Sequence, residues 1–325
     1  MKFGQWKIDG RGRPSEDRSF IREVSGETFV AGVLDGHSGS FTVEFTVRKL
    51  PDKLVELVKT VGDNEAALRS GLLTLFVDHD KFLAKQGGLS YRDSGSTATV
   101  VIVTPKLCCF AYIGDSPACI FNPDTGVIYG SIGKHEPTLP VEQARIVKNG
   151  GEVTTDDGDA PRVNGCLMVS RAFGDFSMKF KEANRPTEEE FAANWATDFC
   201  VIAEPDIVIV PRPEKGILAI FSDGFVETQE TTEYRTYPEI VKQIREAMRG
   251  GALSLNEVAK VCLDQQVAVF TDVPSEYDGD DITLLLINVV SPPITANVAA
   301  NTRQHRTGHR RTRSSKKKLA KSFYI

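Results

Sequence analysis

Short apolar runs rich in β-branched residues, each bounded by Asp or Gly, constrain the fold of this chain more than any other feature. Such runs are typical of buried β-strands. They predict strands at 28–34, 97–103, 107–113, 217–221 and 282–290. Between them, apolar residues recur every three or four positions, which is the spacing of a helix with one buried face. That spacing predicts helices at 41–60, 65–86, 140–149, 237–248 and 255–270.

The order of these predicted elements indicates the fold class. Strands come in adjacent pairs and long helices arrive two at a time, unlike the strict alternation of a doubly wound parallel sheet. The pattern therefore favours an α+β layered sandwich of antiparallel sheets covered by helices. Residues Phe176 to Phe199 mix Lys, Glu, Asn and Pro with scattered aromatics, and we expect them to form a long surface excursion.

Charge is unevenly distributed between the body of the chain and its C-terminal end. Residues 295–325 hold nine of the 39 Lys and Arg residues and none of the 44 Asp and Glu residues. We expect a folded catalytic domain at 1–294 and a basic tail at 295–325 that is disordered, because its apolar content is too low for packing. The tail could be a nuclear-import signal, a patch for acidic partners or a solubilising end. The acidic body argues against nucleic-acid binding, since that depends on Lys and Arg facing phosphates.

The six cysteines form no CxxC pair, which argues against a zinc site or a disulfide framework in a chain of 325 residues. The N-terminus lacks the apolar run of a signal peptide and the Gly after Met that myristoylation needs. No apolar run reaches the roughly 18 residues that a membrane span requires. We expect an intracellular monomer, cytoplasmic or nuclear, with no membrane anchor.

Four acidic signals lie where a predicted strand begins or ends. Glu16 precedes a short apolar run, Asp35 and Asp223 each follow a strand and precede a glycine, and Asp280 lies just before the last strand. Singly, an Asp-Gly pair after a strand is usually only a turn. Together, the strand ends of packed sheets would crowd these carboxylates into one cleft, where like charges raise one another's pKa.

Divalent cations would relieve this crowding. Ligation by carboxylate and carbonyl oxygens favours Mg²⁺ or Mn²⁺ over zinc. The four negative charges of Glu16, Asp35, Asp223 and Asp280 match two such ions. Gly36 allows a tight backbone turn, so that its own carbonyl can reach a cation.

The chain resembles the type 2C (PPM-type) protein serine/threonine phosphatases over nearly all of residues 10–290. Eight segments in the family's order carry the resemblance: Glu16-Asp17, Val33-Leu34-Asp35-Gly36-His37-Ser38-Gly39, Ser94-Gly95-Ser96-Thr97-Ala98, Gly114-Asp115-Ser116, Arg162-Val163-Asn164-Gly165, Val169-Ser170-Arg171-Ala172-Phe173-Gly174-Asp175, Ser222-Asp223-Gly224 and Asp280-Asp281-Ile282-Thr283. The resemblance implies a four-layer sandwich, in which two packed, mainly antiparallel sheets are flanked by pairs of helices. It also implies Mn²⁺- or Mg²⁺-dependent hydrolysis of phosphoserine and phosphothreonine in phosphorylated proteins, by direct attack of water.

The resemblance also implies a role for each residue. Asp35 would bridge two metal ions, Glu16 and the Gly36 carbonyl would serve one of them, and Asp223 and Asp280 would hold the other. Asp35 and His37 are then the expected catalytic residues. His37 would protonate the leaving Ser or Thr oxygen, a task suited to a side chain that titrates near neutrality.

A phosphate clamp is expected near the N-terminus, because the planar fork of arginine bonds two phosphate oxygens at once. The family places its arginine four residues before the metal-binding Glu, a position that Gly12 occupies here. Arg13 is therefore the expected clamp, with Arg11 as the alternative.

Several positions depart from the family pattern. The family usually has an Asp at the Lys134 position that helps to bind a weak third metal, and another third-metal Asp appears here as Glu227. We therefore expect a weakened or absent third site. The family's final Asp-Asn reads Asp280-Asp281, which leaves open which of the two is the ligand.

The excursion at 176–199 corresponds to the family's flap beside the active site. Its basic residues Lys179, Lys181 and Arg185 are either substrate contacts or solvated loop charges.

Other chemistries find little support. No cysteine has the Arg six positions away that a cysteine-dependent phosphatase needs, and no GxxxxGK[ST] motif for nucleotide binding occurs. The serious alternative is a weakly active or inactive scaffold protein that keeps the phosphatase fold and recruits partners through its tail. Every expected ligand position carries an oxygen donor, which favours the enzyme.

Overall fold

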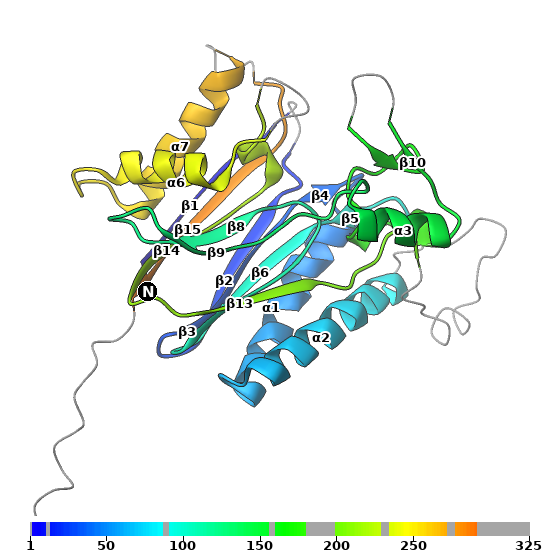
Figure 1. Ribbon diagram of the computed structural model, residues 1–325, viewed down its shortest axis with the longest axis horizontal. Helices are drawn as coiled ribbons and strands as arrows, with labels where there is room; N and C mark the ends of the chain where they lie inside the picture. Colours follow the sequence, from blue (N-terminus) through cyan, green and yellow to red (C-terminus); the bar gives the residue numbers. More distant parts are fainter. Residues whose placement is uncertain are drawn as a thin grey trace, which may run out of the picture. The chain divides into compact units, whose positions relative to one another are not determined.

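Two five-stranded antiparallel sheets pack face to face in the computed structural model, and a pair of helices covers the outer face of each (Figure 1). The structure describes residues 2–10, 14–86, 91–155, 160–179, 199–228, 234–271 and 277–290, all within the unit Met1–Ser291. The strands are β1 (Lys2–Ile8), β2 (Arg18–Ser25), β3 (Thr28–Leu34), β4 (Gly36–His37), β5 (Gly95–Ser96), β6 (Ala98–Val103), β7 (Leu107–Ile113), β8 (Ala118–Phe121), β9 (Ile128–Ser131), β10 (Val153–Thr154), β11 (Arg162–Val163), β12 (Phe173–Gly174), β13 (Asp206–Pro211), β14 (Lys215–Phe221) and β15 (Ile282–Val290). The helices are α1 (Phe41–Val61), α2 (Glu65–Lys85), α3 (Pro140–Lys148), α4 (Phe176–Lys179), the 3₁₀ turn η2 (Asp223–Phe225), α6 (Tyr237–Met248) and α7 (Leu255–Phe270).

The first sheet, called sheet A here, has the strand order β1-β15-β14-β8-β9, and the second, sheet B, has the order β13-β7-β6-β3-β2. The central strands are buried on both faces, so they are continuously apolar rather than alternating. All seven residues of β3 are buried, for example. Phe29, Ala31 and Val33 of β3 lie in the layer between the sheets, whereas Val30 and Leu34 face the helices on the other side.

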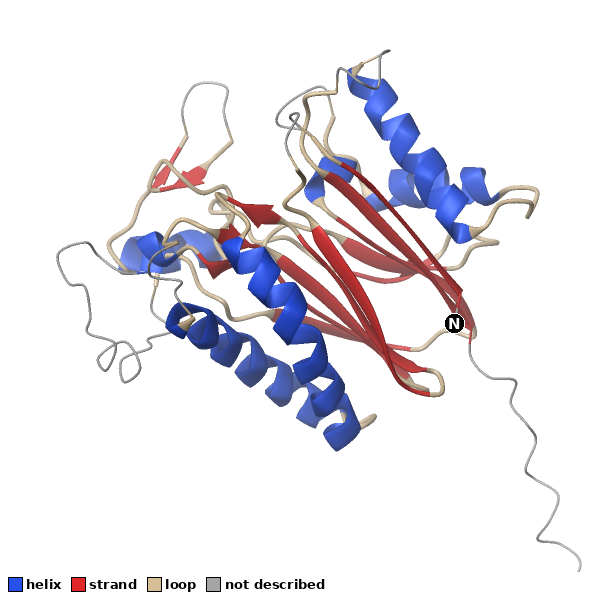
Figure 2. Cartoon of the chain, turned by 180° about the vertical axis from the view of Figure 1, so that it is seen from behind, coloured by secondary structure: helices blue, strands red, loops and turns tan. Residues whose placement is uncertain are grey.

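The helix pairs close the outer layers of the sandwich. Helices α1 and α2 pack on sheet B through Leu50, Leu54 and Leu72, and α6 and α7 pack on sheet A through Ile244 and Leu263. Figure 2 shows the same order of layers from behind. Burial of each such side chain stabilises the fold by about 1.5–3 kcal/mol. The four-layer α+β sandwich expected from the resemblance is therefore confirmed.

All five predicted strands and all five predicted helices agree with the structure to within two residues, but some of the observed strands were not predicted. β1 was not predicted, because three of its seven residues are polar and its apolar side chains do not form a continuous run. It forms an edge of sheet A and pairs along its whole length with β15. Helix α7 covers the outer face of β1, where Trp6 and Ile8 are partly buried.

The predicted surface excursion at 176–199 needs a correction at its start. Residues Phe176–Lys179 form the helix α4, and both Phe176 and Lys179 are buried. Residues 180–198, and with them Lys181 and Arg185, lie outside the described residues, as does the tail at 295–325. Over the described part of the chain, no helix has both the length and the apolar character needed to cross a membrane.

Candidate active site

Strand ends from both sheets converge on a group of aspartates. Asp35 directly follows β3, Asp115 lies two residues after β7, Asp223 lies two residues after β14, and Asp280 lies two residues before β15. Burial raises the pKa of Asp35 well above its usual range, and the charges of Asp17, Asp223, Asp280 and Asp115 raise it further. The crowding of carboxylates predicted from the strand ends is therefore present.

Three of the carboxylates form a tight cluster. Oxygen atoms of Asp223, Glu227 and Asp280 lie within 4.8 Å of one another, in a group that could hold a metal ion. The turn η2 brings two of them together, because the Glu227 amide donates to the Asp223 carbonyl at 3.1 Å and so places both side chains on one side. Gly224 is required in this turn, since a Cβ there would lie 2.4 Å from the Asp281 carbonyl oxygen.

Asp280 and Asp281 have different surroundings. The Asp281 carboxylate accepts hydrogen bonds from the backbone amides of Gly10 at 2.7 Å and Glu16 at 2.8 Å. It therefore ties the loop between β1 and β2 to the start of β15. The Asp280 carboxylate lies in the cluster with Asp223. Of the two residues, Asp280 is thus the one placed to ligate an ion.

Two further aspartates have strongly raised pKa values. Burial raises the pKa of Asp115 to about 8, and the Asp223 charge adds to this effect, while His37 and Lys134 oppose it. Burial likewise raises the pKa of Asp17 to about 7, although the Ser222 hydroxyl donates a hydrogen bond to its Oδ2 atom at 2.7 Å. Folded without cations, these residues hold their protons more tightly than free aspartates do.

The donor set of this site suits hard divalent cations. Carboxylate and carbonyl oxygens are what Mg²⁺ and Mn²⁺ prefer, and no cysteine lines the cluster among the described residues. Glu16 lies beside the loop after Asp35, because its Oε1 atom accepts a hydrogen bond from the Gly39 amide at 3.0 Å. Gly36 packs so closely on Glu16 that a Cβ would lie 2.8 Å from the Glu16 carbonyl oxygen. The residues present therefore fit the metals that the resemblance implies.

His37 belongs to a small three-stranded sheet with the order β12-β5-β4. His37 in β4 pairs with Gly95 in β5, and Asp175 directly follows β12, which pairs with the same strand. The His37 Nε2 atom lies 2.9 Å from both carboxylate oxygens of Asp175. Gly95 makes room for this contact, since a Cβ there would lie 2.1 Å from His37 Nε2. Burial alone would lower the pKa of His37, but the Asp175 carboxylate outweighs it and raises the pKa.

Lys134 lies near Asp115, whose pKa its charge lowers. Its ammonium group forms an ion pair with Glu136 and lies 4.2 Å from the centre of the Tyr234 ring. The Lys134 ammonium group is therefore held beside the carboxylates. This is the position where we expected a third metal site to be weakened or absent.

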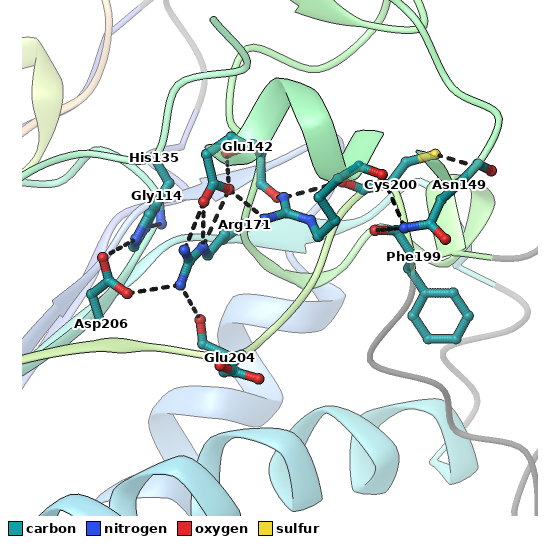
Figure 3. A network of polar contacts seen from close by, with 11 residues as sticks. Gly114, His135, Glu142, Asn149, Arg171, Phe199, Cys200, Glu204 and Asp206 are labelled. Atoms are coloured by element: carbon teal, nitrogen blue, oxygen red, sulfur yellow. Dashed lines mark hydrogen bonds and ion pairs between the residues drawn. The ribbon is translucent and has the colours of Figure 1, made fainter. Parts of the chain in front are cut away.

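A network of ion pairs supports the backbone that leads to Asp115 (Figure 3). The His135 Nδ1 atom accepts a hydrogen bond from the Gly114 amide at 3.2 Å, and its Nε2 atom lies 3.3 Å from Asp206. Asp206 pairs with Arg171 at 3.0 Å, and Arg171 pairs with Glu142 at 2.6 Å. Strand β13 and helix α3 are thereby connected to the loop that carries Asp115.

The sequence-predicted site residues fall into three groups. Asp35, Asp223 and Asp280 come together as expected, with Glu16 and His37 close by. Arg11 and Arg13 lie outside the described residues. Lys179, predicted as a substrate contact or a solvated charge, is neither, because its ammonium group is buried against Asp80 at 2.6 Å.

Asp115 and Asp175 were not predicted as site residues. Asp115 follows the end of a strand just as Asp35 does, so the same rule would have found it. Asp175 could have been predicted only from the resemblance, because it is the last residue of the matching segment at 169–175.

The comparisons with known proteins agree on one family. A model described as protein phosphatase 2C matches residues 2–271. Probable protein phosphatase 2C 55 of Oryza sativa subsp. japonica is 32% identical over 220 residues, which cover 67% of this chain and 56% of that protein. Protein phosphatase 2C 57 of Arabidopsis thaliana is 28% identical over 291 residues, which cover 82% of this chain and 72% of that protein. The chain thus spans little more than half of the rice relative's length.

Solved structures support the same fold. A phosphatase from a pathogenic strain of Toxoplasma gondii superimposes with a TM-score of 0.71 at 20% identity, covering 89% of this chain and 92% of that one. A serine-threonine phosphatase 2C from the same organism gives a TM-score of 0.66 at 17% identity, covering 88% of this chain and 94% of that one.

Proposed function

Because the chain belongs to the protein phosphatase 2C family, we propose that it is a protein serine/threonine phosphatase that hydrolyses phosphoserine and phosphothreonine with two Mn²⁺ or Mg²⁺ ions. The observation that carries this proposal is the convergence of Asp35, Asp115, Asp223 and Asp280 from the strand ends of both sheets. So many half-buried carboxylates close together are costly unless cations compensate their charges.

The ligand assignment is part of the proposal. Asp35 would bridge the two ions, Glu16 and the Gly36 carbonyl would complete one site, and Asp223 and Asp280 would complete the other. The contacts of Asp281 with two backbone amides support the choice of Asp280. Bound there, the ions would acidify a water molecule and neutralise charge on the phosphoryl oxygens.

The chain's own residues would position the substrate and move the proton. Arg13, or Arg11 in its place, would hold two oxygens of the phosphate dianion. His37 would donate its Nδ1 proton to the leaving oxygen of serine or threonine, because its Nε2 atom faces Asp175. The raised pKa of His37 supports this role, because it keeps the imidazole protonated nearer to neutral pH. Asp175 holds the charged ring in place.

The remaining parts of the proposal concern the whole chain. We propose that it acts as an intracellular monomer on phosphoproteins, with a catalytic domain at 1–294 and a basic tail at 295–325 that serves nuclear import. Deleting residues 295–325 from a fluorescently labelled chain tests the last point. Unchanged nuclear signal after the deletion would contradict import through the tail.

The test of the proposed function is phosphate release from a phosphothreonine peptide, with and without Mn²⁺. We expect release only with the metal, and a loss of at least about 100-fold in Asp223→Asn, which removes a charged ligand. The control is Asp278→Asn, because Asp278 is an exposed aspartate two residues before Asp280. No release by the folded, Mn²⁺-loaded native chain would leave a binding or scaffold protein as the better description.

A further inference from the structure

A pocket of about 430 Å³ lies directly beside the carboxylate cluster. Its size is within the range of roughly 300–1,000 Å³ that is usual for ligand pockets. Three parts of the chain form its walls, which are the segments next to β8 and β9, the end of β14 with η2, and the first turn of α6. None of the roles proposed above uses this pocket.

The pocket and the cluster share two side chains. Asp115 and Asp223 line the pocket, and both also take part in the group of carboxylates around Asp35. Any group bound in the pocket therefore lies next to the place where a phosphate would be hydrolysed. A substrate chain held by its phosphate can reach the pocket with a nearby side chain, since an extended chain advances about 3.3–3.6 Å per residue.

The walls of the pocket are held by contacts of their own. The Tyr237 hydroxyl donates a hydrogen bond to the Ile132 carbonyl at 2.8 Å, which ties α6 to the segment after β9. Its ring packs edge-on against Phe221, with the ring centres 6.4 Å apart. A capping box between Thr236 and Glu239 fixes the first turn of α6. The pocket is therefore formed before any ligand binds.

The two cations that line the pocket are already engaged by the protein. The Arg235 guanidinium donates to Gln266 at 2.8 Å and to Gln243 at 2.6 Å. Lys134 pairs with Glu136 and with the face of Tyr234. Neither charge needs a partner from the ligand.

The rest of the lining is chiefly apolar, with the side chains of Pro117, Ile132, Val226, Pro238 and Ile240. An acidic group would be repelled by the carboxylates of Asp115 and Asp223. A basic group would lose its hydration in a pocket with mainly apolar walls. An uncharged apolar group therefore fits the pocket best.

We propose that this pocket binds one large aliphatic or aromatic side chain of the phosphoprotein substrate, from a residue within a few positions of the phosphorylated one. The pocket then acts as a specificity subsite. This inference rests on the proposed phosphatase function.

A series of phosphothreonine peptides tests the proposal with the native, Mn²⁺-loaded chain. The reference peptide has alanine at every flanking position, and each other peptide carries one leucine or phenylalanine at a position from three before to three after the phosphothreonine. We expect kcat/KM to rise about 10- to 100-fold at one or two positions, as burial of one large apolar side chain allows. Equal kcat/KM for all peptides would overturn the subsite while leaving the phosphatase function established. No hydrolysis of any peptide would overturn both.

Two variants locate the preference in the pocket. Pro238→Phe narrows it from the exposed first turn of α6, a position where proline is favourable but not required. Pro238→Ala is the matched control, because it removes the same proline without filling the space. We expect the preference for the apolar side chain to disappear in Pro238→Phe and to remain in Pro238→Ala, with the alanine reference peptide hydrolysed equally by both.

A second variant, Ile132→Ala, enlarges the pocket instead of narrowing it. The proposal can therefore still be tested if Pro238→Phe does not fold. It is expected to shift the preference from leucine towards tryptophan. A native-like preference in both Pro238→Phe and Ile132→Ala would place the subsite elsewhere and overturn the proposal.

Discussion

At the scale of single residues, the contact with Asp175 holds His37, the proposed proton donor, in a fixed orientation. Both carboxylate oxygens of Asp175 lie 2.9 Å from His37 Nε2. The side chain of His37 remains 25% exposed, whereas that of Asp175 is 5% exposed. The imidazole is thus anchored on one side and open towards the site on the other.

Replacing His37 separates proton donation from the rest of the reaction. We expect His37→Ala to lower kcat on a phosphothreonine peptide by about 100-fold, because an alkoxide leaving group needs a proton. With p-nitrophenyl phosphate the loss should be less than about tenfold, since that leaving group departs as an anion at neutral pH. Steady-state kinetics on both substrates make the comparison.

Asp175→Asn is the companion variant and should give an intermediate loss with the same dependence on the leaving group. An equal loss on both substrates for His37→Ala would show that the histidine supports the structure rather than donating a proton.

The proximity of three carboxylates was predicted from sequence because a local rule applied to each of them. Asp35, Asp223 and Asp280 were found because a carboxylate at the end of a buried strand can be recognised from its neighbours alone. The partner of His37 could not be derived in this way. Asp175 is 138 positions away in the sequence, and only the pairing of β12, β5 and β4 brings the two together.

At the scale of elements, a buried ion pair joins α4 to α2. The Lys179 ammonium donates to Asp80 Oδ2 at 2.6 Å and to the Ala172 carbonyl at 3.0 Å. Asp80 Oδ1 accepts a hydrogen bond from the amide of Gly174 at 2.8 Å, and Gly174 is the residue directly before Asp175. Helix α2 is thereby linked to the strand that presents Asp175 to His37.

Breaking this pair should destabilise the fold strongly. We expect Lys179→Met to lower the free energy of unfolding by about 3–5 kcal/mol, because it leaves the Asp80 carboxylate buried without a cation. Urea denaturation provides the measurement. The control Lys81→Met removes a half-exposed lysine 3.4 Å from Asp78, and it should cost no more than about 1 kcal/mol. Adding Asp80→Asn to Lys179→Met should recover part of the loss, and a strictly additive double variant would argue against direct coupling.

The network around Glu142 predicts a defined dependence on pH. Burial would raise the pKa of Glu142, but hydrogen bonds from Arg171 and Ser170 and the charge of Arg145 outweigh it and lower the pKa to about 2. A carboxyl group whose pKa is lowered by folding stabilises the fold above its ordinary pKa of 4.5, and this stabilisation is lost as the pH falls towards 2.

We therefore expect Glu142→Gln to destabilise the protein by about 3 kcal/mol at pH 7, since two arginines lose their buried partner. The difference from the native chain should shrink as the pH falls below 4.5, because Glu142 is then protonated in the unfolded chain while the folded protein keeps it charged down to about pH 2. Thermal unfolding of both proteins at about pH 2.5, 4 and 7 measures the difference in stability. The exposed Glu152→Gln is the control, and a pH-independent gap in Glu142→Gln would contradict the assignment of the charge.

Strands were predicted from the sequence where both of their faces are buried. Strands such as β3 and β15 are enclosed on both faces, so their continuous apolar runs stand out in the sequence. The outer strand β13 was missed although residues 207–210 are all β-branched, and its side chains are only partly buried at an edge of sheet B. Its position depends on antiparallel pairing with β7, which is a tertiary interaction.

At the scale of the whole molecule, the two sheets bring together carboxylates whose negative charges repel one another. The pKa of Asp17 is raised to about 7 and that of Asp115 to about 8, both mainly by burial. A carboxyl group whose pKa is raised by folding stabilises the fold below its ordinary pKa of 3.8, and the stabilisation is lost as the pH rises through the folded value. The metal-free protein should therefore be less stable at alkaline than at mildly acidic pH.

Thermal unfolding in EDTA, followed from about pH 5 to about pH 8.5, should show Tm falling as these aspartates ionise. Mn²⁺ should reverse the fall, because cations bind the ionised form, and an excess of 100-fold over Kd stabilises the native state by about 2.7 kcal/mol. The rise in Tm caused by Mn²⁺ should consequently be larger at pH 8.5 than at pH 5, because at pH 5 the metal must first displace protons from the carboxyl groups. Asp115→Asn removes one of the crowded charges, so in EDTA its Tm should depend less on pH than that of the native chain. If Tm in EDTA does not change across this range, the carboxylates do not repel one another in the folded protein, and the physical argument for a two-metal site loses its basis.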